Sequence, residues 1–195
     1  GVRLVGSEMC IRDSYVAKTN EAMDEMTGLQ AIDAAITAAR RHGYQQIALK
    51  YAGGEAALNF KLVCLLHDYA IQRVHAAGLL LSEALLSNGT TLTTARLEFL
   101  HKAKIGLMIS LDGPPIVNDL LRPGIHGKSP TVSVMASIDR ALAIGFSPDI
   151  NIVVSPQSVP YLAETLRFVL DRGLRFSLNF VRDHAGCLLY TSPSP

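Results

Sequence analysis

Segments with a helical pattern and segments with a strand pattern alternate along this chain of 195 residues, from residue 27 almost to its end. Strand-like apolar runs are predicted at 46–52, 79–87, 105–111, 149–154 and 175–181. Each strand-and-helix unit is roughly 25–45 residues long, which suits parallel strands joined by right-handed helical crossovers. The pattern therefore predicts an α/β protein with a parallel sheet, and the apolar strands favour a sheet that is covered by helices.

The ends of the predicted helices carry local signals. Thr27 and Gln30 form a capping-box pattern at the start of the first helix. Ser129 and Pro130 suit the N-cap and first positions of a later helix. Between the third strand and that helix, the Gly- and Pro-rich segment 112–128 is predicted to be an irregular loop. Glycines mark the ends of four helices, at Gly43, Gly78, Gly145 and Gly173.

The architecture is narrowed further by chain length. An eight-stranded barrel usually needs about 250 residues, so the chain allows only part of a barrel or an open doubly wound sheet. In both architectures ligands bind where the parallel strands end. Polar residues and glycines collect at these predicted ends: Gly53, Gly54 and Glu55; Ser87, Asn88 and Gly89; Ser110, Asp112 and Gly113; Ser155; and Asn179. This pattern predicts a site for a small molecule.

Composition excludes several classes of function. The formal net charge is +1, which leaves no electrostatic basis for binding nucleic acid or an anionic membrane. No apolar run reaches the roughly 18–20 residues of a membrane-spanning helix, and no secretory signal pattern is present. The three cysteines, Cys10, Cys64 and Cys187, have neither metal-ligand nor disulfide spacing. We therefore expect a soluble, cytoplasmic protein with no metal ligands in this sequence.

Three segments at the predicted strand ends resemble motifs of one enzyme superfamily. They are 51–60 (YAGGEAALNF), 85–92 (LLSNGTTL) and 109–122 (ISLDGPPIVNDLLR). In this order, on successive strand-and-helix units, they resemble the radical S-adenosylmethionine (radical SAM) superfamily. Within it, they are most similar to the anaerobic sulfatase-maturating and SPASM-type peptide-modifying enzymes. The resemblance implies a partial (β/α)6 TIM-like barrel whose first strand, with its cluster-binding loop, is missing from this sequence.

The resemblance also implies which residues bind S-adenosylmethionine (AdoMet). In the family, the GGE motif binds the ammonium group, and the SNG and SxDG segments line the ribose and the methionyl part. Asp119 and Arg122 match an Asp-x-x-Arg pattern of the following loop, with Arg122 as a candidate partner of the cofactor's carboxylate. The residues expected to bind the cofactor are Gly53, Gly54, Glu55, Ser87, Asn88, Ser110, Asp112 and Arg122.

A 4Fe–4S cluster is the second cofactor that the resemblance implies. In the family, a CxxxCxxC loop holds it through three thiolates, and reductive cleavage of AdoMet starts hydrogen abstraction from the substrate. The implied partners are a peptide or protein substrate and an electron donor such as flavodoxin or ferredoxin. CxxxCxxC is absent here, but Tyr15 and Val16 match residues that often follow its last cysteine. We therefore expect the cluster ligands upstream of this sequence, and an inactive product from the sequence as written.

Both ends of the chain resemble translated sequencing adapter. A codon choice exists for 4–14 (LVGSEMCIRDS) whose reverse complement, read in a shifted frame, encodes 187–195 (CLLYTSPSP). Two unrelated protein termini would not be related in this way. We therefore expect 1–14 and 187–195 to be artefacts and 15–186 to be a fragment of the core domain.

Two other functions stay open. An aldolase- or isomerase-type barrel would use the same strand-end polar groups for acid–base chemistry, with Lys50 as the nearest lysine. The chain could also be a folded remnant without activity. Among residues outside the motifs, Cys64 lies between apolar neighbours and is expected to be a packed thiol, and the pair His67 and His75 is only a weak metal-site pattern.

Overall fold

Five parallel strands form one sheet in the order β1-β2-β3-β4-β5, so each strand pairs with its neighbours in sequence. The computed structural model describes residues 22–123 and 129–180, and the predicted boundaries at residues 14 and 187 lie outside them. The elements in chain order are α1 (Glu25–Arg41), β1 (Gln46–Tyr51), η1 (Ala56–Asn59), α2 (Phe60–Ala76), β2 (Leu80–Ser87), α3 (Thr94–Lys102), β3 (Gly106–Ser110), α4 (Pro115–Leu121), α5 (Pro130–Ala143), β4 (Asp149–Val154), η3 (Val159–Tyr161), α6 (Leu162–Asp171) and β5 (Arg175–Phe180).

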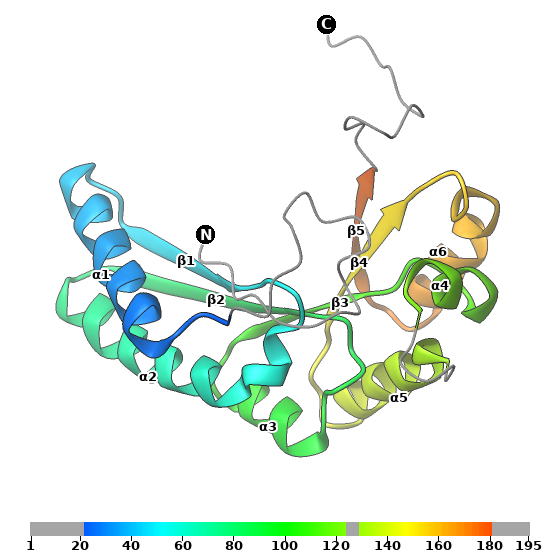
Figure 1. The fold of residues 1–195 in the computed structure, drawn as a ribbon, viewed down its shortest axis with the longest axis horizontal. Coiled ribbons are helices and arrows are strands. Elements are labelled where there is room, and N and C mark those ends of the chain that lie inside the picture. Colours follow the sequence, from blue (N-terminus) through cyan, green and yellow to red (C-terminus); the bar gives the residue numbers. More distant parts are fainter. Residues whose placement is uncertain (1–21, 124–128, 181–195) are drawn as a thin grey trace, which may run out of the picture.

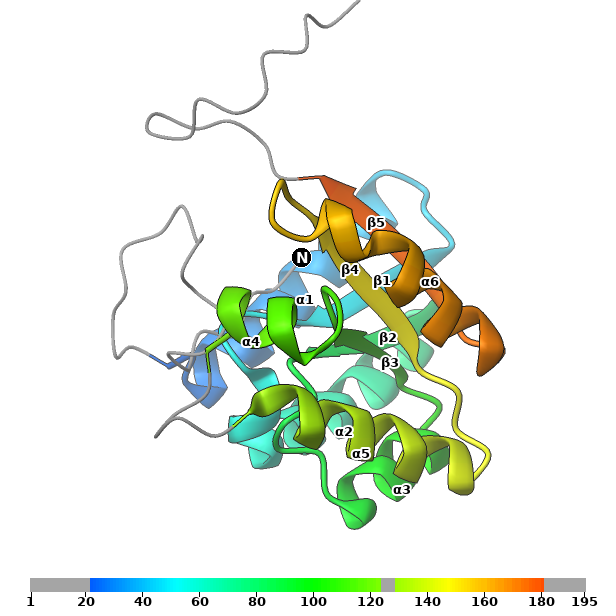
Figure 2. The ribbon, with the colours of Figure 1, turned by 90° about the vertical axis from the view of Figure 1, so that its right-hand side faces the viewer.

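The sheet is curved, and helices lie on its outer side. Figure 1 shows the strands along an arc from β1 to β5, with α1, α2 and α3 outside one half and α5 and α6 outside the other. Figure 2 shows α6 beside β4 and α5 next to β3. Five parallel strands alternating with helices in this way form a half-barrel, which confirms the predicted α/β class and the partial-barrel architecture.

Burial alternates along the strands. In β1 the residues Ile47, Leu49 and Tyr51 are buried and those between them are exposed, and β4 shows a related alternation. Successive side chains of a strand point to opposite faces, so one face packs against the helices. The other is the inner face of the curve, and no described helix covers it. The expected covering by helices is therefore confirmed for one face, whereas an open doubly wound sheet would carry helices on both.

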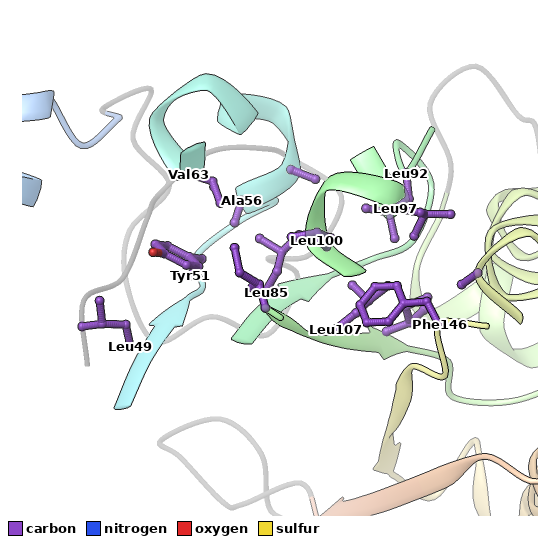
Figure 3. Packing of buried hydrophobic residues seen from close by; sticks show 14 of the residues in the cluster. Leu49, Tyr51, Ala56, Val63, Leu85, Leu92, Leu97, Leu100, Leu107 and Phe146 are labelled. Atoms are coloured by element: carbon purple, nitrogen blue, oxygen red, sulfur yellow. The ribbon is translucent and has the colours of Figure 1, made fainter. Parts of the chain in front are cut away.

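The core lies between the outer face of the sheet and the helices. Leu85 of β2 and Leu107 of β3 meet Leu97 and Leu100 of α3, and Phe146, which follows α5, closes this part of the core (Figure 3). Leu85, Leu97 and Leu100 have no exposed surface. Fully burying a leucine side chain contributes about 1.5–3 kcal/mol. This packing holds the first three strands in the register on which the strand ends depend.

Two helix starts differ from the predictions. The first helix begins at Glu25, because the Asp24 carboxylate accepts a hydrogen bond from Thr27 N at 2.7 Å and so replaces the predicted Thr27 cap. Ser129 and Pro130 do occupy the N-cap and first positions of α5, but the Ser129 hydroxyl makes no capping bond. The Asp119 carboxylate caps this helix instead, by accepting from Thr131 N at 3.1 Å.

The segment predicted as an irregular loop, 112–128, contains the helix α4. Pro115 sits in the first turn, where a missing N–H costs nothing, and so supports a helix start that composition alone had hidden. The four predicted helix-ending glycines have φ between 64° and 75°, the left-handed conformation expected after a helix. None of the described helices is both long and apolar enough to cross a membrane.

Candidate functional site

The predicted site residues all lie at or just beyond one edge of the sheet. Parallel pairing aligns the strands, with Tyr51 opposite Leu85, Ser87 opposite Ile109, and Ser110 opposite Asn151. The carboxyl ends of β1, β2 and β3 therefore meet at the same edge. We call the turns that follow these three strands, together with the last residues of β2 and β3, the rim: 52–55, 87–90 and 110–114.

Glu55 joins the first two turns of the rim. Its Oε1 accepts hydrogen bonds from Ala57 N at 3.1 Å and from the Ser87 hydroxyl at 2.7 Å, and its Oε2 accepts from Asn88 N at 2.6 Å. The residue is only 2% exposed. The bond to Ala57 N caps η1, and the bonds to Ser87 and Asn88 connect β1 to the end of β2. Glu55 is thus both a helix cap and a link across the rim.

The glycines before Glu55 differ from it in accessibility. Gly53 is exposed and Gly54 is half-buried, whereas the Glu55 carboxylate faces the protein. Gly53 has a φ of 150°, which a residue with a side chain rarely adopts. The part of the GGE segment that a ligand can reach is therefore its backbone.

The charge of Glu55 is unfavourable in this setting. Burial is the largest effect and raises the pKa of Glu55 above its usual value. Hydrogen bonds from Asn88 N, the Ser87 hydroxyl and Ala57 N oppose the shift without cancelling it. A carboxylate has about four acceptor positions, and three donors occupy this one.

The turn after β2 is organised by its own side chains. Ser87 Oγ accepts from Gly89 N at 3.0 Å, and Asn88 Oδ1 accepts from Thr90 N at 2.9 Å and from the Thr90 hydroxyl at 2.7 Å. Gly89 has a φ of 79°, and a Cβ there would lie 3.0 Å from Ile109 Cγ2. A side chain at this position would therefore be strained, which favours glycine.

Asp112 holds the turn after β3. Its carboxylate accepts from Arg122 Nε at 2.7 Å, from Arg122 Nη2 at 3.3 Å, and from Val153 N of β4 at 2.8 Å. Its own backbone N–H donates to Asn118 Oδ1 at 2.9 Å. Asp112 is 3% exposed. This carboxylate connects β3, β4 and the end of α4, and it is paired with a cation.

Asp119, which the sequence motif placed in the loop after β3, holds the start of α5 together with Asn118 and Thr131. Asp119 accepts from both the backbone N–H and the hydroxyl of Thr131, so it fixes the start of α5. Asn118 donates to Thr131 Oγ1 at 2.7 Å and is 1% exposed. Sequence analysis missed the roles of Asn118 and Thr131, because the hydrogen bonds connect segments on either side of 124–128.

A third buried carboxylate, that of Glu83, lies earlier on β2, before the strand reaches the rim. Glu83 of β2 accepts from the Tyr51 hydroxyl at 2.5 Å, and its Oε2 is 2.7 Å from His67 Nδ1. The side chains of Glu83 and His67 are each 6% exposed. Burial, followed by the bond to Glu83, raises the pKa of Tyr51. No local sequence pattern predicts this network, which joins β1, β2 and α2.

The structure thus brings the predicted site residues together in two groups. Glu55, Ser87 and Asn88 are in direct contact, and so are Asp112 and Arg122. Ser110 is half-buried at the end of β3, between the groups. Among the described residues, neither Ser110 Oγ nor Asn88 Nδ2 makes a hydrogen bond, which leaves both available to a ligand.

The described residues contain no group of three His, Cys, Asp or Glu side chains that could hold a metal ion. Cys64 is a free thiol on α2 and is half-buried, so the expectation of a packed thiol holds in part. His67 is bonded to Glu83.

No family model matches the sequence. An uncharacterized protein of Methanocaldococcus jannaschii is 29% identical over 163 residues, which are 84% of this chain and 54% of that protein. The chain therefore spans about half the length of this relative.

Several solved structures have a similar fold. The enzyme anSMEcpe with bound AdoMet and Kp18Cys peptide superposes with a TM-score of 0.76 at 17% identity, over 98% of this chain and 52% of that one. SuiB of Streptococcus suis, bound to the precursor peptide SuiA, gives 0.57 at 18% identity, over 84% and 34%. A radical SAM methyltransferase of Sphaerobacter thermophilus gives 0.56 at 15% identity, over 83% and 59%. The described half-barrel therefore has the fold of part of the radical SAM barrel.

Proposed function

We propose that the rim binds AdoMet and that this chain is part of a radical SAM enzyme acting on a peptide or protein side chain. The observation that carries the proposal is the convergence of Glu55, Asn88, Ser110 and Asp112 on one edge of a half-barrel with this fold. Two structures with the fold hold a peptide, Kp18Cys in one and SuiA in the other, and this supports a peptide substrate.

The residues at the rim suit the chemical groups of AdoMet. The backbone at Gly53 and Gly54 can approach a ligand closely because no side chain intervenes. Asn88 Nδ2 and the Ser110 hydroxyl would bind the ribose hydroxyls. Arg122, with its side chain 18% exposed beside Asp112, would attract the carboxylate. When bound in such enzymes, AdoMet supplies the group that abstracts hydrogen from the substrate.

The described residues do not fit a 4Fe–4S cluster, which takes three or four cysteine thiolates. Cys64 is the cysteine that these residues contain, and it lies on α2 rather than in a loop at the rim. The proposal therefore assigns the cluster, and the flavodoxin or ferredoxin that would reduce it, to a longer protein that includes this chain. Residues 1–14 and 187–195 are proposed to be adapter sequence, which the source DNA would verify.

Titration calorimetry with AdoMet tests the proposal on the chain itself. We expect saturable binding that is weakened about tenfold, or 1.4 kcal/mol, by Asn88→Ala and by Ser110→Ala. Ser82→Ala is the matched control, because Ser82 is exposed on β2 but lies away from the rim. Absence of AdoMet binding, or equal binding by the wild type and both rim variants, would contradict an AdoMet site at the rim.

A further inference from the structure

We infer that Glu55 is a positioning residue, whose carboxylate shapes the turn after β2 and does not itself touch the ligand. The inference rests on the proposed function, since it concerns how an AdoMet site at the rim would be built. It replaces direct contact between the carboxylate and the cofactor's ammonium with an indirect role.

The first argument is that protein donors occupy three of the roughly four acceptor positions of the buried Glu55 carboxylate. Three protein donors lie at hydrogen-bond distance: Ala57 N at 3.1 Å, the Ser87 hydroxyl at 2.7 Å and Asn88 N at 2.6 Å. With 2% of the residue exposed, no side of the carboxylate is open. Contact with a ligand would require the turns around the carboxylate to open or one of these bonds to break, and a buried donor left without an acceptor is costly.

The second argument is that the hydrogen bonds continue from Glu55 into the turn. A serine hydroxyl has one proton, and Ser87 gives it to Glu55, so the lone pairs of Ser87 Oγ face Gly89 N, 3.0 Å away. The bond from Asn88 N to Glu55 fixes the backbone from which the Asn88 side chain extends. One carboxylate therefore orients two successive residues of the rim.

The third argument is that the ligand-facing groups are the neighbours of Glu55. Among the described residues, Asn88 Nδ2 has no hydrogen-bond partner, while Asn88 Oδ1 is held by Thr90. The amide is thus oriented with its donor unused. Loss of the Glu55 carboxylate would free the backbone at Asn88, so the direction of the Asn88 side chain would no longer be fixed.

The variants Glu55→Gln and Ser87→Ala test this role. In either orientation of the Gln amide, one of the two backbone donors, Ala57 N or Asn88 N, loses its acceptor. We expect amide exchange, measured by NMR on the full chain, to accelerate about tenfold or more in Glu55→Gln at Gly89 and at whichever of Ala57 and Asn88 loses its acceptor. Glu98→Gln, at an exposed position of α3, is the matched control and should change none of these rates.

Two ligands distinguish indirect from direct action. AdoMet carries the amino-acid ammonium, whereas 5′-methylthioadenosine has the nucleoside without it. We expect Glu55→Gln to weaken the binding of both ligands by the same factor, because the turn has moved. If Glu55 contacted the ammonium directly, Glu55→Gln would weaken the binding of AdoMet alone, and that result would overturn the inference.

The outcomes separate this inference from the proposed function. If the wild type binds neither ligand, the proposed function fails, and the exchange rates still decide the role of Glu55 in the turn. Unchanged exchange at Ala57, Asn88 and Gly89 together in Glu55→Gln would overturn the inference even if AdoMet binds. Should Glu55→Gln not fold, Ser87→Ala removes only one donor and is expected to accelerate exchange at Gly89 without affecting Leu97 in α3.

Discussion

The first two turns of the rim and the turn after β3 stabilise a buried acid in different ways. Each contains a buried acid, with Glu55 2% exposed and Asp112 3% exposed. Three neutral donors hold Glu55, whereas Asp112 has a guanidinium and one backbone N–H. Burying a charge is tolerated when it is paired and hydrogen-bonded. An ion pair therefore stabilises the turn after β3, whereas hydrogen bonds from neutral donors hold the first two turns, with a weaker electrostatic contribution from Arg96.

This difference shows that a buried acid at a strand end need not be a ligand. Both carboxylates connect neighbouring strands, β1 to β2 through Glu55 and β3 to β4 through Asp112. They hold the turns in place, while Asn88 Nδ2 and Ser110 Oγ are left without partners among the described residues. The comparison predicts different consequences when each acid loses its charge.

The largest effect is expected for Asp112→Asn. The change removes the charge of a buried carboxylate that accepts from Arg122 Nε and Val153 N, and the Arg122 side chain is only 18% exposed. Breaking a buried ion pair by removing one partner costs about 3–5 kcal/mol. Urea unfolding would measure the loss. Asp139→Asn, in an exposed pair with Arg172, is the control, with an expected change of about 0–1 kcal/mol. Equal effects of the two variants would remove the distinction between the buried and the exposed pair.

A smaller loss is expected for Glu55→Gln. The three donors to Glu55 are neutral, so the cost is that of an unsatisfied buried donor, about 1–3 kcal/mol. The same urea unfolding experiment, run beside Asp112→Asn, compares the two regions directly. If Glu55→Gln were the more destabilising variant, the ion pair of Asp112 could not stabilise the fold more than the hydrogen bonds to Glu55 do.

The smallest expected effect is a dependence on pH of the stability that Glu55 contributes. The pKa of Glu55 is raised, chiefly by burial, so the folded state binds the proton of this group at higher pH than the unfolded state. The contribution of Glu55 to the free energy of unfolding is therefore complete below the unfolded value of about 4.3 and is lost as pH rises through the folded pKa. We expect the stability difference, wild type minus Glu55→Gln, to increase as pH falls from neutral. Parallel pH profiles would contradict the raised pKa.

Local patterns in the sequence were sufficient for most of the helices and strands and for the edge of the sheet that carries the candidate site. The strand at 46–52, the helix-ending glycines and the polar residues after each strand depend on neighbours in the chain, and the structure confirms them. The helix α4 was missed because Gly and Pro dominate its surroundings, although Pro115 suits a helix start. Asp24 replaced Thr27 as the cap because both residues are good N-caps, and the apolar pattern does not say which begins the helix.

The direction of the Glu55 side chain could not be predicted. It depends on Ser87 and Asn88, 32 and 33 residues further along the chain, which only the pairing of β1 with β2 brings near. The same holds for Asp112, whose partner Val153 N lies 41 residues away. Sequence motifs placed these acids at the rim, but long-range contacts decided whether their oxygens face the ligand or the protein.

Amide exchange with and without AdoMet most directly tests the central claim that the carboxyl edge of β1, β2 and β3 forms one binding site. We predict that AdoMet protects the amides of 52–59, 87–92 and 110–123 together. The turns at the opposite edge of the sheet, 42–45, 77–79 and 103–105, should exchange at unchanged rates. Protection of the opposite edge, or of only one of the three rim segments, would contradict a shared site.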